Sequence, residues 1–173
     1  MNKAKSPLRT LTLLRHAKSS WKDPALTDIE RPLNKRGRRD ARAMAHRIVE
    51  HGATLTTIFA SPARRSRETL TRILLTLPAQ DTSITVDQAF YTFECDALVN
   101  AIRSFDDNLQ DVMIIGHNPA LEEAITWMTG TTLSCFPTTA CAQLTLTLSS
   151  WKKLQPGCAD LMWLLTPEKS LTV

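Results

Sequence analysis

Two histidines and several arginines stand where short apolar runs of the sequence end. Arg15 and His16 follow the first of these runs. Arg65 lies just beyond the second run, and His117 follows the third. The runs cover residues 9–14, 57–60 and 111–115. Guanidinium groups are permanently charged forks that match phosphate oxygens, and a neutral imidazole is nucleophilic at cellular pH, so these residue types predict chemistry on a phosphoryl group.

A histidine at such a site could attack phosphorus directly. Attack by one imidazole nitrogen would give a phosphohistidine and divide one difficult displacement into two easier ones. The arginines would position the phosphoryl group and neutralise charge on its oxygens. Taken singly, each motif is ordinary: an Arg-His pair after a strand is usually plain surface, and Gly-His-Asn at 116–118 is more often a helix cap. The hypothesis depends on their being brought together.

Two histidines could also hold a metal ion. No H-x-x-x-H or carboxylate pattern completes a coordination sphere, however, and the flanking arginines would repel a cation. The four cysteines form no C-x-x-C pair, which argues against a zinc site or a disulfide framework. We therefore expect no metal ion.

The apolar periodicity places these residues in an α/β fold. It predicts strands at residues 9–14, 57–60, 84–86, 111–115, 142–148 and 161–165, and helices at about 35–51, 62–77, 97–105 and 119–129. Strand and helix alternate before the last two strands, which could pair with each other. This order predicts a mostly parallel central sheet covered by helices. Ligands bind outside the carboxyl ends of such strands, so the histidines and arginines should meet at one edge of the sheet.

Capping residues mark where these helices should begin. Ser61 is expected to cap a helix whose first residue is Pro62, and Asp96 is expected to cap a later one. Asn118 is expected at the start of the last helix. Arg65 then falls in the first turn of its helix, where free N–H groups favour an anion.

Length and charge exclude several function classes. The chain has 173 residues, which fits one domain spanning residues 1–173, and its formal net charge is +4. Much of the positive charge lies between Arg31 and Arg42, where it could form a solvated helix face, bind nucleic acid or attract an anionic substrate. No aromatic residues interleave with these charges and no zinc-finger pattern accompanies them, so we expect no nucleic-acid partner.

The sequence also bears on location. No run of 18 apolar residues predicts a membrane span, so no membrane partner is expected. The residues before Arg15 and His16 contain no apolar stretch of the length that a secretory signal needs. Together these features predict a cytoplasmic protein.

Four segments resemble the motifs of one known family. Residues 13–19 (LLRHAKS) are similar to the R-H-G signature of the histidine phosphatase superfamily, also called phosphoglycerate-mutase-like. Residues 60–69 (ASPARRSRET) resemble its S-P-x-x-R-A-x-x-T stretch, and residues 114–119 (IIGHNP) resemble the stretch with its second histidine. Residues 28–33 (DIERPL), followed by Gly37, resemble the D-x-x-R-P-L…G stretch of SixA-type phosphohistidine phosphatases. Their order, their spacing and the short chain favour the SixA branch.

The resemblance implies a three-layer α/β/α sandwich of the phosphoglycerate-mutase-like kind, and it implies a role for each residue. His16 would be the nucleophile. Arg15 and Arg65 would bind phosphate oxygens, and His117 would donate a hydrogen bond to the same group. Three further residues would bind substrate around the pocket: Asp28, Arg31 and Asn118. No metal or organic cofactor is implied.

One part of the family pattern is missing. The mutases and many ester phosphatases of the superfamily use a glutamate as general acid, and no motif identifies one here; Glu94, Asp96 and Asp28 are candidates by position alone. An alkoxide leaving group gains about 100- to 10,000-fold from general acid catalysis, whereas the imidazole of phosphohistidine needs less help. The gap favours phosphohistidine on a protein, such as a phosphorelay or phosphotransfer domain, as the substrate.

Two alternatives stay open. The same scaffold could hydrolyse a small phosphorylated metabolite, which would call for a carboxylate close to the leaving-group oxygen. The chain could also be a non-catalytic module that binds phosphate or a phosphoprotein. The presence of all four central residues argues against such a silent module: Arg15, His16, Arg65 and His117.

Overall fold

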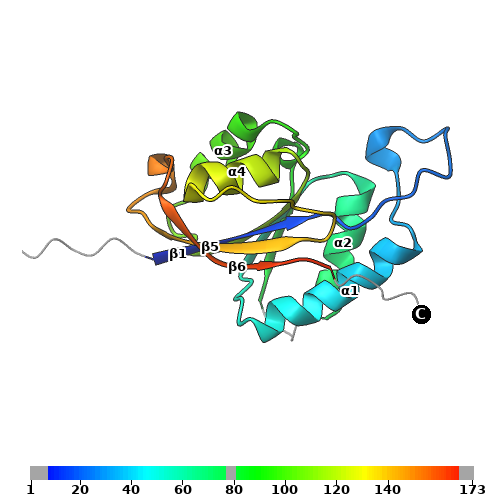
Figure 1. Cartoon of the computed structure of the whole chain (residues 1–173), viewed down its shortest axis with the longest axis horizontal. Coiled ribbons are helices and arrows are strands. Elements are labelled where there is room, and N and C mark those ends of the chain that lie inside the picture. The colour runs from blue at the N-terminus through cyan, green and yellow to red at the C-terminus, as the bar shows by residue number, and fades with distance from the viewer. Residues whose placement is uncertain (1–7, 77–80, 168–173) are drawn as a thin grey trace, which may run out of the picture.

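The computed structural model describes residues 8–76 and 81–167, which are built around one six-stranded sheet (Figure 1). The strands are β1 (Leu8–Arg15), β2 (Thr57–Ala60), β3 (Ser83–Val86), β4 (Asp111–Gly116), β5 (Cys141–Thr147) and β6 (Ala159–Leu165). They follow the order β3-β2-β4-β1-β5-β6. The first four strands, β1, β2, β3 and β4, are parallel to one another. β5 pairs antiparallel with both β1 and β6. The expected mostly parallel sheet and the pairing of the last two strands are confirmed.

Helices cover both faces of this sheet. The four α-helices are α1 (Lys35–Glu50), α2 (Arg64–Leu74), α3 (Cys95–Arg103) and α4 (Ala120–Thr129). One apolar core lies between the sheet and the pair α3 and α4, and another lies between the sheet and the pair α1 and α2. Figure 1 shows α3 and α4 above the sheet and α1 below it. The three-layer α/β/α sandwich is therefore confirmed.

The position of β1 at the centre of the sheet explains its continuous apolar run. Leu11, Leu13 and Leu14 are all fully buried because helices cover both faces of the strand. The parallel register places Arg15 of β1 opposite Gly116 of β4. In the same way, the end of β2 lies opposite the end of β4. The residues that follow these three strands consequently meet at one edge of the sheet.

Two helix starts differ from the sequence prediction by two residues each, and that of α4, at Ala120, differs by one. α2 begins at Arg64 instead of Pro62, because Ser61 still extends the sheet: its N–H donates to the Ile115 carbonyl oxygen at 3.0 Å. α3 begins at Cys95, so Asp96 lies in its first turn and is not the cap. A carboxylate there is still favourable for the helix dipole. α2 ends at Leu74, three residues before the predicted end at residue 77, which itself lies outside the described residues.

The connection from β1 to α1 is a long segment held together at its base. Ser19 forms an isolated bridge with Leu33, and the Ser20 N–H donates to the Pro32 carbonyl oxygen at 2.8 Å. Gly37 is required beside this base, since a Cβ there would collide with the carbonyl oxygen of Lys18. Figure 1 shows the segment, in blue, reaching out beyond the end of β1. Among the described residues, no helix combines the length and the apolar character needed to cross a membrane.

Candidate active site

His16 lies directly beyond β1 and is 8% exposed. Its Nδ1 is 2.8 Å from the Ala17 carbonyl oxygen. A carbonyl oxygen can only accept, so Nδ1 carries the hydrogen and donates it. Nε2 therefore keeps its lone pair, which is the tautomer that a nucleophile attacking through Nε2 requires.

Arg65 joins the two histidines. Its side chain is almost fully buried, and its Nε donates to His16 Nε2 at 3.1 Å. Its Nη2 lies 3.2 Å from His117 Nδ1. The neighbouring Arg64 instead points outward and pairs with Glu68 at 3.0 Å. The structure therefore brings Arg65, and not Arg64, next to the two histidines.

His117 is the second buried histidine, with its ring centroid 4.9 Å from that of His16. Because a guanidinium group can only donate, the His117 Nδ1 that faces Arg65 must accept. Nε2 then carries the hydrogen and donates it to Ser61 Oγ at 2.8 Å. Ser61 is fully buried, and its hydroxyl binds both partners: it accepts from His117 and from the Ala63 N–H at 3.2 Å, just before α2 begins.

Arg15 and Asn118 share one acceptor. Arg15 Nη1 and Asn118 Nδ2 both donate to the Phe136 carbonyl oxygen, at 2.8 and 2.9 Å. Asn118 Nδ2 also donates to Glu122 at 2.8 Å. Both amide hydrogens of Asn118 are thus used within the protein, and what remains is an oxygen that cannot donate to a phosphate. This arrangement argues against the expected contact of Asn118 with substrate, while it fixes the guanidinium of Arg15 beside the site.

Asp28 bridges the basic groups of the site. Its Oδ1 accepts from Arg31 Nη1 at 2.8 Å, and its Oδ2 accepts from Arg65 Nη2 at 2.8 Å. The Tyr91 hydroxyl also donates to Oδ2, at 2.8 Å. Arg31 is buried, with 8% of its surface exposed, and its side chain shares the Asp28 carboxylate with Arg65. Asp28 and Arg31 therefore lie at the site, with Asp28 bound to the arginines.

Burial and charge fix the ionisation of this cluster. Burial, reinforced by the positive charge of Arg65, lowers the pKa of His16 from 6.5 to about 3 although its bond to Ala17 opposes the change. Burial and the neighbouring His16 lower the pKa of His117 from 6.5 to about 2. Partial burial acts to raise the pKa of Asp28, but the hydrogen bonds from Tyr91 and Arg65 outweigh it and leave that pKa below its usual value. Both imidazoles are consequently neutral and the carboxyl group is ionised.

The neutral histidine pair should make folding stability depend on pH. Both folded-state pKa values lie below 6.5, so the unfolded chain binds protons that the folded protein does not. Stability must then fall as the pH drops below the unfolded value, by about 2 kcal/mol for each histidine between about pH 7 and about pH 5. Urea unfolding at the two pH values measures this change. A His16→Asn variant should lose about half of it, and equal stability of the wild-type protein at both pH values would contradict the assignment.

Part of the sequence that forms this site matches the model of a known family. Residues 11–91 match the family model of the histidine phosphatase superfamily (branch 1), a stretch that contains His16 and Arg65. The chain belongs to the histidine phosphatase superfamily. Among curated proteins, it is 31% identical over 177 residues to an uncharacterised chloroplastic protein of Arabidopsis thaliana, covering 95% of this chain and 81% of that protein.

Solved structures of this superfamily share the fold. A proposed phosphohistidine phosphatase SixA from Agrobacterium tumefaciens is 27% identical, with a TM-score of 0.79 over 93% of this chain and 99% of that one. A protein histidine phosphatase SixA complexed with tungstate is 21% identical, with a TM-score of 0.76 over 91% of this chain and 97% of that one. The fold of this histidine phosphatase is thus SixA-like along nearly its whole length.

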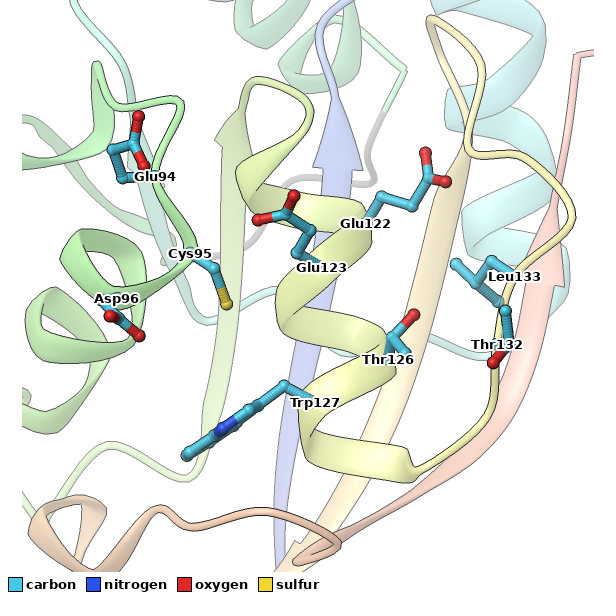
Figure 2. Close-up of a pocket in the computed structure, with 9 residues that line it drawn as sticks. All are labelled: Glu94, Cys95, Asp96, Glu122, Glu123, Thr126, Trp127, Thr132 and Leu133. Atoms are coloured by element: carbon cyan, nitrogen blue, oxygen red, sulfur yellow. The ribbon is translucent and has the colours of Figure 1, made fainter.

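Among the described residues, two of the candidate general acids form no hydrogen bond or ion pair with His16, Arg65 or His117. Glu94 and Asp96 line a cavity of about 610 Å³ around α4, shown in Figure 2. Glu122 and Trp127 of α4 line it too. Its lining includes none of the four central residues: Arg15, His16, Arg65 and His117. Asp28 is therefore the one candidate acid that the structure brings to His16 and Arg65.

Sequence reasoning missed two residues of the site. Tyr91 donates to Asp28 and packs edge-on against His117, with ring centroids 5.3 Å apart. Phe93 packs against the same histidine at 5.2 Å. Neither belongs to a motif with chemical meaning. The one signal in the sequence is composition: Tyr91 is the single tyrosine of the chain, and it lies in a segment for which the apolar pattern predicts no helix or strand.

Proposed function

We propose that this histidine phosphatase hydrolyses phosphohistidine on a phosphorylated protein, through a covalent intermediate on His16. The observation that carries the proposal is the pairing of a neutral, buried His16 with an Asp28 that is ionised and bound to two arginines. The first can attack phosphorus, and the second is poorly suited to protonate an alkoxide. A phosphorelay or phosphotransfer domain is the kind of partner that this favours, and a cytoplasmic location stays a prediction from the sequence.

In the first step, the lone pair of His16 Nε2 attacks phosphorus and the P–N bond to the substrate imidazole breaks. The electron pair goes to the leaving imidazole nitrogen, which takes a proton from solvent. In the resting site that lone pair accepts from Arg65 Nε at 3.1 Å, so the phosphoryl group must enter between the two side chains. Arg65 then donates to phosphoryl oxygens, with Arg15 as the second guanidinium. Water next attacks phosphorus and gives up a proton to solvent, the electron pair of the broken P–N bond returns to His16 Nε2, and phosphate leaves.

Ser61 gives His117 a way to assist. In the resting site His117 donates from Nε2 to Ser61 Oγ, so its Nδ1 has no hydrogen to offer a phosphoryl oxygen. A hydroxyl group can donate as well as accept. If Ser61 donates to Nε2 instead, Nδ1 carries the hydrogen and can bond the phosphoryl group that replaces Arg65 beside it. This exchange needs no change in the net charge of the site.

The choice of substrate follows from the state of Asp28. A general acid must hold a proton at working pH, and the hydrogen bonds from Tyr91 and Arg65 keep the pKa of Asp28 below its usual value. Phosphate esters depend on such an acid, whereas phosphohistidine has a better leaving group. The tetrahedral oxyanion tungstate held by the SixA structure described above is consistent with an anion site of this kind.

The test is phosphate release from two kinds of substrate. One substrate is a histidine phosphotransfer domain phosphorylated on its histidine, and the other is a panel of small phosphate esters. We expect kcat/KM for the domain to exceed that for every ester by at least about a hundredfold, which is the lower end of the rate gain from general acid catalysis. A preference for esters would favour the metabolite phosphatase. Binding of the phosphorylated domain without release from either substrate would favour a non-catalytic module.

A further inference from the structure

Two exposed aromatic side chains flank the histidine pair. Trp21 is 73% exposed and Phe93 is 40% exposed. Each lies one contact away from a group of the site: the Trp21 ring centroid is 3.3 Å from the guanidinium carbon of Arg31, and the Phe93 ring centroid is 5.2 Å from that of His117. They come from chain segments more than seventy positions apart. The fold therefore brings both side chains next to the same cluster, Trp21 through Arg31 and Phe93 through His117.

We propose that Trp21 and Phe93, here called the aromatic rim, form the docking surface for the phosphorylated protein. This inference rests on the proposed function and adds the part of the enzyme that recognises the partner. The occupant is the partner's surface around its phosphohistidine, and the contact is an apolar patch on that surface.

The Trp21 side of the rim is preorganised. Arg31, on which the indole ring stacks, donates to Asp28 at 2.8 Å and from Nε to the Ser20 carbonyl oxygen at 3.2 Å. The backbone around it is held by the pairing of Ser20 with Pro32 at 2.8 Å. A ring held this way loses little conformational entropy when a partner covers it, so more of the burial free energy goes to binding. Such rigid aromatic anchors are the usual hot spots of protein interfaces.

The geometry of the substrate selects a protein as occupant. A phosphohistidine side chain is short, so the backbone that carries it must approach the mouth closely while phosphorus reaches His16. The partner's surface then lies over Trp21 and Phe93. A small phosphoramidate or ester binds beside Arg65 without covering the outer face of Trp21, which leaves that side chain in water. The rim should therefore act on protein substrates and contribute little for small ones.

The test compares one variant on two substrates. Trp21→Ala is assayed on a phosphorylated histidine phosphotransfer domain and on free phosphohistidine, and the readout is the ratio of the two kcat/KM values. We expect this ratio to fall about tenfold, mainly through KM for the domain, as truncation of an interface hot spot would cause. Trp21→Phe, which keeps an aromatic ring over Arg31, should retain most of the ratio. Leu75→Ala is the matched control, since Leu75 is 77% exposed but follows the far end of α2.

Each outcome decides a separate point. An equal loss on both substrates would overturn the docking role and would mean that Trp21 merely holds Arg31 in place. An unchanged ratio in Trp21→Ala would also overturn it, as would the same fall in Leu75→Ala. Failure of the wild-type protein to release phosphate from the domain would instead refute the proposed function itself, and the inference with it.

Discussion

His16→Ala is expected to abolish turnover, with a loss of at least about a thousandfold in kcat/KM on phosphohistidine. The reason is that the variant removes the atom that forms the covalent bond, Nε2. His117 is the nearest alternative among the described residues, but its Nδ1 is expected to carry a hydrogen when the phosphoryl group is bound, and its Nε2 is bound to Ser61. The measurement is phosphate release under saturating and limiting substrate.

Two further measurements make this result specific. His46→Ala is the matched control, because His46 is an exposed histidine on α1 and should leave the rate within about twofold of wild type. A substrate labelled in its phosphoryl group should leave base-stable label on the wild-type protein and none on His16→Ala. Label on that variant, or turnover comparable with wild type, would show that His16 is not the nucleophile.

Much of the fold could be predicted because its strands have strong local signals. β4 is a run of apolar residues buried on both faces, and the structure ends it at Gly116, one residue beyond the predicted end. The predicted helix starts were less accurate. Ser61 accepts the Ala63 N–H as a cap would, but its own N–H pairs with β4, its hydroxyl also binds His117, and the helix starts only at Arg64. Propensity alone could not reveal this competition.

The centre of the site could be predicted for a different reason. Parallel strands bring their carboxyl ends to one edge, so the residues after β1, β2 and β4 had to converge once the fold class was known. The contacts around Asp28 have no such rule. Tyr91 reaches Asp28 from 63 positions away, out of a segment without periodicity. Such a contact depends on where a loop lies in three dimensions.

The role of Asp28 shows why a candidate acid cannot be judged from sequence. Its position after the first strand fits an acid, a substrate ligand or a structural carboxylate equally well. Its protonation depends on the neighbours that the fold supplies, which are Arg31, Arg65 and Tyr91. Two guanidinium groups and a hydroxyl all favour the charged form. The structure therefore turns an ambiguous candidate into a group that orients the arginines.

Arg65→Ala is expected to lose about a hundredfold to a thousandfold in kcat/KM, the usual effect of removing one charged donor from the transition state. Among the described residues, Arg65 is the one side chain that contacts His16, His117 and Asp28 together, so its loss removes the phosphate clamp and one of the two guanidinium partners of Asp28. Arg65→Lys should recover only part of the activity, because an ammonium group cannot reproduce the planar fork. Saturation kinetics on phosphohistidine measure all three proteins.

Arg64→Ala is the matched control within the same helix turn. Its side chain is 57% exposed and pairs only with Glu68, an exposed pair of small energetic value, so the expected change is below about threefold. The two variants remove the same group from adjacent positions and differ only in which side of α2 they affect. A larger loss in Arg64→Ala than in Arg65→Ala would show that the motif register was wrong. The expected ranking would mean that the position of one guanidinium, and not the positive charge of the helix, holds the phosphoryl group.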